Sequence, residues 1–65
     1  MEIFVNGDRI ETSASTVARL VQELGLPPQT LMVEHNGLAL HRSEWPDKHL
    51  AAGDRIEILR VSAGG

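Results

Sequence analysis

The stretch that decides the fold is residues 16–28, which read TVARLVQELGLPP. Its apolar side chains follow the spacing i, i+3, i+4 and i+7, which places them on one face of a helix. They are Val17, Leu20, Val21 and Leu24. A single helix with one apolar face must cover one apolar surface, so the rest of the chain is expected to supply a sheet.

Signals at both ends of this stretch define the helix. The hydroxyl of Thr16 or Ser15 can accept a hydrogen bond from an orphan amide of the first turn. Gly25 suits the left-handed conformation that follows many helices, and Leu26 can then fold back on the last turn in a Schellman motif. The two prolines at residues 27–28 prevent the helix from continuing.

Two Asn-Gly pairs, Asn6-Gly7 and Asn36-Gly37, stand outside the helix. Asn-Gly between apolar segments is the strongest short-range hairpin signal, because both central residues of a type I′ turn need positive φ. The segments predicted as strands are residues 1–5, 9–12, 31–35, 38–40 and 55–61. Residues 41–50 are expected to be irregular, since Pro46 disfavours a regular strand.

The predicted order is hairpin, helix, hairpin, irregular segment and final strand. In a chain of 65 residues, this order is typical of an α+β domain of the β-grasp, or ubiquitin-like, architecture. A mixed sheet of four to five strands is expected to be covered on one face by one α-helix. Residues 1–61 would form this domain, and residues 62–65 would form a flexible tail ending in Gly-Gly.

Composition excludes several classes of protein. The net charge is −3, from six basic and nine acidic residues, which disfavours nucleic acid binding because that binding rests on Lys and Arg. The chain has no cysteine, so neither a disulfide nor a thiolate metal site can support it. We find no signal-peptide pattern and no apolar run long enough to cross a membrane. These features indicate a cytoplasmic protein.

Familiar catalytic patterns are missing from the sequence. Without cysteine there is no thiol nucleophile, and no serine sits in a nucleophile elbow. The spacing of His35, His41 and His49 fits no metal-ligand pattern, so they are interpreted as surface or turn residues and no metal is expected. Trp45 could be a binding hot spot, but a lone tryptophan in so small a domain more often closes one end of the core.

A possible partner surface lies on the sheet face that the helix leaves uncovered. Ile56 and Ile58 alternate with Leu59 and Val61, so the second pair faces away from the helix if the first pair faces it. By the same alternation, Phe4 faces away from the helix in the first strand. An exposed apolar patch of Phe4, Leu59 and Val61 would fit a protein partner, although scattered surface apolar residues are also common.

The remaining candidate for chemistry is the pair Gly64-Gly65 directly after the last strand. Glycine has no Cβ, so such an arm is thin and can adopt extended or left-handed conformations. It could pass through a narrow channel in an activating enzyme. The reactive group would then be the carboxylate of Gly65, with Gly64 providing access, and the chain would need no catalytic residue of its own.

Over almost its whole length, the chain resembles the ThiS-type sulfur carriers of thiamine biosynthesis. These are relatives of the small subunit of molybdopterin synthase (MoaD) and of ubiquitin. The resemblance rests on Phe4-Val5-Asn6-Gly7, Thr16-Val17-Ala18-Arg19-Leu20, Glu34-His35-Asn36-Gly37, Arg42-Ser43-Glu44-Trp45, Gly53-Asp54-Arg55-Ile56-Glu57-Ile58 and Gly64-Gly65. The Arg-Ser-x-Trp segment separates this family from its molybdopterin relatives. His41 is a departure, since many members have proline there, and it should affect only a turn.

The resemblance implies a mechanism and partners. An E1-like adenylating enzyme of the ThiF type would use ATP to convert the Gly65 carboxylate to an acyl-adenylate, and a sulfur donor system would displace AMP to leave a thiocarboxylate. A thiazole synthase of the ThiG type would then take the sulfur. The chain would be a protein cosubstrate rather than an enzyme, with no bound cofactor, and ATP would be used by its partner.

Three other functions stay open at this point. The chain could carry sulfur for molybdopterin or another metabolite. It could be a ubiquitin-like modifier joined to lysines through Gly65, or a β-grasp binding module in which the two glycines are incidental.

Overall fold

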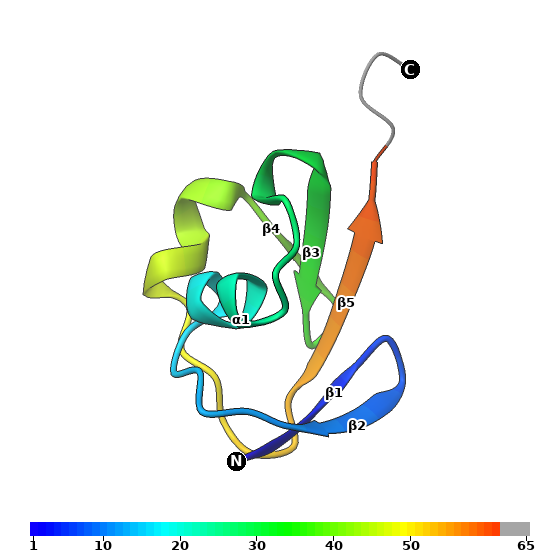
Figure 1. Cartoon of the computed structure of the whole chain (residues 1–65), viewed down its shortest axis with the longest axis vertical. Coiled ribbons are helices and arrows are strands. Elements are labelled where there is room, and N and C mark those ends of the chain that lie inside the picture. Colours follow the sequence, from blue (N-terminus) through cyan, green and yellow to red (C-terminus); the bar gives the residue numbers. More distant parts are fainter. Residues whose placement is uncertain (62–65) are drawn as a thin grey trace.

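The computed structural model describes residues 1–61. They form five strands, one α-helix and two short 3₁₀ helices (Figure 1). In chain order these elements are β1 (Glu2–Val5), β2 (Asp8–Glu11), α1 (Val17–Glu23), η1 (Pro28–Thr30), β3 (Leu31–His35), β4 (Leu38–Leu40), η2 (Arg42–Asp47) and β5 (Arg55–Arg60).

The five strands make one mixed sheet in the order β2-β1-β5-β3-β4. β5 lies in the middle, parallel to β1 and antiparallel to β3. The helix α1 lies against one face of this sheet, with η2 beside it (Figure 1). This arrangement confirms the predicted β-grasp fold. No helix within residues 1–61 is long and apolar enough to cross a membrane.

Both Asn-Gly turns have the predicted conformation. φ is positive at Asn6 (51°), Gly7 (86°), Asn36 (49°) and Gly37 (87°). The first turn joins β1 to β2 and the second joins β3 to β4, each as a two-residue hairpin. These turns have the twist that suits the flanking strands, so they hold the register of both hairpins.

The ends of α1 are built as the sequence predicts. The Thr16 side-chain oxygen accepts a hydrogen bond from the Arg19 amide at 3.2 Å. At the other end, the Leu26 amide donates to the Val21 carbonyl at 3.4 Å while Gly25 holds φ at 70°. This is the Schellman motif.

The core lies between α1 and the sheet. The largest fully buried side chains come from β1, α1, β3 and β5: Ile3, Val17, Leu20, Val33 and Ile56. Burial of each such side chain contributes about 1.5–3 kcal/mol. Leu24, predicted on the buried face, is 38% exposed because α1 ends at Glu23 and Leu24 lies at its C-cap.

Residues 41–50 are more regular than predicted, because residues 42–47 form η2. A capping interaction starts this helix: the His41 amide donates to a Glu44 carboxylate oxygen at 2.8 Å. Trp45, only 3% exposed, anchors η2 in the core. The tryptophan therefore has the structural position expected for a residue that closes one end of the core.

Candidate functional site

The predicted reactive residues, Gly64 and Gly65, lie outside the described residues. The structure describes the strand that precedes them, β5, and its surroundings. On one side, β5 pairs with β3 from Ile56, opposite His35, to Arg60, opposite Leu31. A further bond follows the strand, since the Val61 amide donates to the Thr30 carbonyl at 2.6 Å. The backbone is therefore held to the sheet as far as Val61.

The two faces of β5 differ in exposure as predicted. Ile56 and Ile58 are 1% and 8% exposed and face α1. Leu59 and Val61, which alternate with them, are 55% and 44% exposed. Met32 of β3, 54% exposed, lies directly opposite Leu59. We call Met32, Leu59 and Val61 the apolar end patch.

The structure does not bring Phe4 into the apolar end patch. Phe4 lies opposite Arg55 in the parallel pairing of β1 with β5, four residues before Leu59. At about 3.3 Å per residue, this separation is roughly 13 Å along the strand. Glu57, exposed between Arg55 and Leu59 on the same face, interrupts the apolar surface. Met32 was missed from the sequence because the register of β3 against β5 was unknown.

The three histidines lie in separate settings. His35 contacts Asp54 (Nε2 to Oδ2, 2.8 Å), and both side chains are about one-seventh exposed. His41 begins η2, and His49 forms a bridge with Thr16. Within residues 1–61, no group of three or more His, Asp or Glu side chains is arranged to hold a metal ion.

Asp54 ties the β3–β4 turn to the segment before β5. Its carboxylate accepts hydrogen bonds from the Ala51 amide at 2.9 Å and from the Asn36 side chain at 3.1 Å, besides the contact with His35. Burial alone would raise the pKa of the Asp54 carboxyl, but the hydrogen bonds outweigh burial and hold that pKa below its ordinary value. The cluster is structural: it fixes the start of β5.

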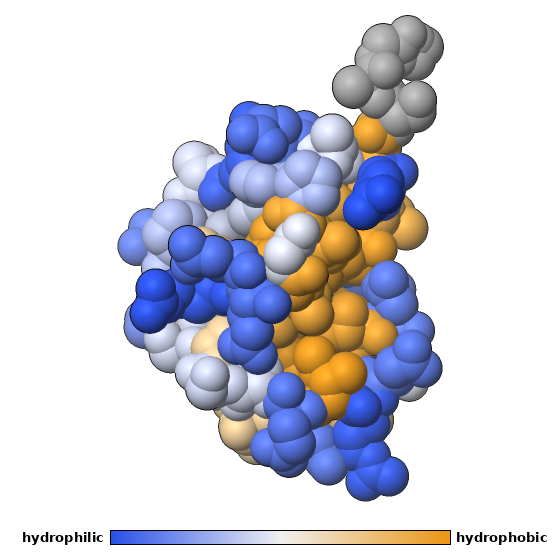
Figure 2. All heavy atoms as spheres, in the orientation of Figure 1, coloured by the Kyte–Doolittle hydropathy of each residue, from blue (hydrophilic) through white to orange (hydrophobic). Residues whose placement is uncertain are grey.

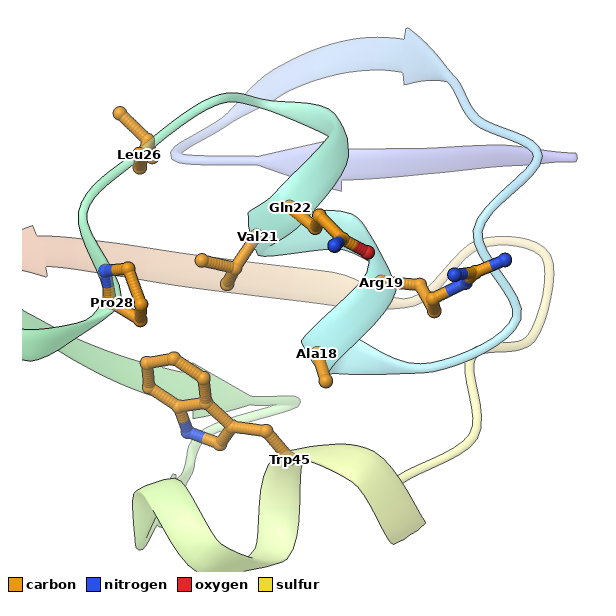
Figure 3. A pocket seen from close by; sticks show the side chains of 7 residues that line it. All are labelled: Ala18, Arg19, Val21, Gln22, Leu26, Pro28 and Trp45. Carbon is orange, nitrogen blue, oxygen red and sulfur yellow. The ribbon is translucent and has the colours of Figure 1, made fainter.

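A hollow of about 470 Å³ lies between α1 and η2 (Figure 3). The ring of Trp45 forms one wall, Val21 and Gln22 another, and Pro28 closes one end. Arg19 is its single charged lining residue. The hollow therefore offers no pair of groups for acid–base or nucleophilic chemistry.

The model of the ThiS family matches residues 3–65 of this chain. The chain belongs to the ThiS family. The match confirms the resemblance predicted from the sequence, and it includes both Gly64 and Gly65.

Solved structures give the same result. The crystal structure of a thiamine biosynthesis protein, ThiS, from Geobacter metallireducens is 29% identical to this chain. It covers all of both chains with a TM-score of 0.85. The solution structure of a thiamine biosynthesis protein from the same organism, also 29% identical, matches all of this chain and 88% of that one with a TM-score of 0.79. No curated protein sequence matches the chain.

Proposed function

We propose that this ThiS-family chain is a sulfur carrier of thiamine biosynthesis and that its Gly65 carboxylate carries the sulfur. The family match through residue 65 is the observation that supports the proposal most directly. The Geobacter metallireducens structures, both of proteins named for thiamine biosynthesis, support the choice of pathway.

The chemistry takes place in two steps at one carboxylate. A carboxylate resists nucleophiles, so the Gly65 carboxylate first attacks the α-phosphorus of ATP, which gives an acyl-adenylate and releases pyrophosphate. A hydrosulfide nucleophile supplied by a sulfur donor system then attacks the acyl carbon, the bond between the acyl carbon and the phosphate oxygen breaks, and AMP leaves. The product is a Gly65 thiocarboxylate. Gly64, with no Cβ, leaves room for the approach of both partners.

The chain itself supplies recognition rather than catalysis. It has no cysteine, so the sulfur comes from a source outside the chain. We assign adenylation to an E1-like enzyme of the ThiF type, sulfur delivery to a donor system, and sulfur use to a thiazole synthase of the ThiG type. The apolar end patch is suited to dock these partners, because its three side chains are each about half exposed.

Intact mass after reaction tests the proposal. The chain is incubated with ATP, the adenylating enzyme of its host and a sulfur source. A mass gain equal to the replacement of one oxygen by one sulfur is expected, and fragmentation should place it at Gly65. An unchanged mass with an enzyme shown to be active on another carrier would refute the proposal.

Two controls identify the site and the pathway. A variant with one alanine added after Gly65 should gain no sulfur and should unfold at the same urea concentration as the original chain. The thiocarboxylate form should then support thiazole formation by a thiazole synthase. Isopeptide-linked adducts would instead indicate a protein modifier, and sulfur transfer only to a molybdopterin precursor would indicate the other pathway.

A further inference from the structure

The two edges of β5 differ in how far a neighbouring strand pairs with them: β3 pairs as far as Arg60, and β1 pairs only as far as Ile56. Backbone groups of alternate residues in a strand point to opposite neighbours. Arg55 and Val61 bond toward β3: the Asn36 amide donates to the Arg55 carbonyl at 2.8 Å, and the Val61 amide donates to Thr30. By this alternation, Glu57 and Leu59 also bond toward β3. The backbone groups of the other three residues therefore point toward β1; these are Ile56, Ile58 and Arg60.

β1 is too short to use all of these groups. Its pairing with β5 ends at Val5 opposite Ile56, and the Asn6 amide donates to the Ile56 carbonyl at 2.9 Å. The side chain of Asn6 then makes the hydrogen bonds to β5 that a further residue of β1 would make. Its Oδ1 accepts from the Ile58 amide at 2.7 Å and its Nδ2 donates to the Ile58 carbonyl at 3.1 Å. Both backbone groups of Ile58 are satisfied in this way.

Arg60 is the next residue on this edge. Among residues 1–61, no strand pairs with β5 beyond Val5 on the β1 side. The chain turns back at Asn6-Gly7, and β5 continues past that turn with β3 on its other side (Figure 1). The amide and carbonyl of Arg60 thus form an open sheet edge.

An apolar hollow lies directly beside this edge. It has a volume of about 200 Å³ and lies on the helix-covered face. Its lining is mostly apolar, with two polar residues, and consists of Val5, Asn6, Leu24, Leu26, Leu31, Ile58 and Arg60. Figure 2 shows an apolar band that runs over β1 and β5 beside α1. Within the described residues, no carboxylate lies within salt-bridge distance of Arg60.

We infer that a partner protein adds an extended segment to β5 at Arg60, in line with β1. The inference rests on the proposed function, since the partner is the adenylating enzyme that acts on Gly65. A backbone carbonyl of the segment would accept a hydrogen bond from the Arg60 amide, and a backbone amide of the segment would donate one to the Arg60 carbonyl. Side chains two residues apart share a face, so an apolar side chain can fill the hollow while a carboxylate pairs with the Arg60 guanidinium. Addition of a strand to an open edge is a general mode of peptide recognition.

Charge argues against a second copy of this chain as the occupant. Among the described residues of β5, Arg60 is the residue whose backbone amide and carbonyl face the β1 side without a neighbouring strand. Antiparallel pairing of two such edges would therefore place one Arg60 opposite the other, and like charges directly opposite are destabilising. A carboxylate on a partner segment meets the same guanidinium favourably.

Hydrogen exchange of single amides tests the edge. In the free chain, the Arg60 amide should exchange much faster than the Val61 amide, which donates to Thr30. In the complex with the adenylating enzyme, the Arg60 amide should become protected by about tenfold or more. Exchange at the free-chain rate in a saturated complex would overturn the inference. Protection that rises with the concentration of the free chain alone would also overturn it, in favour of a second copy.

A matched pair of proline variants tests the same edge by function. Arg60→Pro removes the open amide, and Arg9→Pro removes an amide on the outer edge of β2, because the Thr12 amide bonds toward β1 and alternation turns Arg9 outward. Proline is tolerated at such edges. At limiting enzyme, Arg60→Pro should acquire sulfur about three- to tenfold more slowly, while Arg9→Pro should match the original chain.

The outcomes separate the inference from the proposed function. If the original chain acquires sulfur and both proline variants do so equally fast, the inference fails and the proposed function stands. If the original chain acquires none, the proposed function fails. Should Arg60→Pro not fold, Arg60→Glu against Arg9→Glu replaces the pair. Charge reversal at residue 60 should slow sulfur acquisition at limiting enzyme, and equal rates for the two Glu variants would again overturn the inference.

Discussion

Asn6 shows how one residue can serve the fold in two ways. The Asn-Gly pair predicts its positive φ, which the structure confirms at 51°. The two bonds from its side chain to Ile58 could not be predicted, because nothing local to Asn6 says that β5 is its neighbour. The partner is 52 residues away, and the order of strands in the sheet decides the contact.

Replacing Asn6 tests this second role. Asn6→Gly keeps the backbone conformation of the turn at low cost but removes both bonds to Ile58. The expected loss in the free energy of unfolding is about 1–3 kcal/mol, measured by urea denaturation. Asn6→Asp keeps the acceptor for the Ile58 amide and loses the donor, so its loss should be intermediate. If Asn6→Gly is as stable as the original chain, the side-chain bonds contribute nothing.

Asp54 makes the stability of the chain depend on acidity. Its pKa is lowered from 3.8 in the folded state, so the carboxylate form is favoured by folding. Its contribution is fully present above the unfolded pKa and is lost as the pH falls through the folded pKa. The free energy of unfolding should therefore decrease as the pH drops below about 4.

The control for this acid dependence is Asp54→Asn, which cannot ionise. In urea titrations at a series of pH values, this variant should start less stable near neutral pH. Part of the decrease below about pH 4 should also disappear. If the free energy of unfolding of Asp54→Asn decreases below about pH 4 as much as that of the original chain, carboxylates other than Asp54 cause the decrease.

At the scale of elements, the helix α1 was predictable because its signals are local. Thr16 and Gly25 stand at the positions that a cap and a Schellman motif require, and the structure places both there. The 3₁₀ helix η2 was not predictable, because its stability depends on the burial of Trp45 against α1. Leu24 was misplaced for a related reason: the periodic pattern continues one residue beyond the helix itself.

Gly25 offers a test of the helix end. A Cβ at this position would meet no atom within 4 Å, so Gly25→Ala introduces only the strain of a positive φ. The expected cost is about 1–2 kcal/mol in the free energy of unfolding. Gly25→Asn should cost less, since asparagine visits the left-handed region more readily. Equal losses for the two variants in urea denaturation would mean that φ at residue 25 does not limit stability.

At the scale of the whole molecule, the order of the strands decides how β5, the strand that leads to Gly64 and Gly65, is held in the sheet. β5 is central, so β1 and β3 hold it at its start, and β3 holds it alone toward its end. The sequence predicted the alternation of Ile56 and Ile58 with Leu59 and Val61. It could not predict that Met32 would join Leu59, or that Phe4 would lie about four residues away from it, because both depend on register between distant strands.

The apolar end patch leads to the last prediction, which concerns docking. Leu59 is 55% exposed, so Leu59→Glu should change the free energy of unfolding by no more than about 0.5 kcal/mol. If partners dock on this patch, the same change places an unpaired charge in the interface and should slow thiocarboxylate formation at limiting adenylating enzyme by about tenfold or more. Leu38→Glu is the matched control: Leu38 is 68% exposed but lies opposite His35, at the other end of β3. Equal slowing by both variants would indicate a general effect of charge, and no slowing by Leu59→Glu would place the docking surface elsewhere on the sheet.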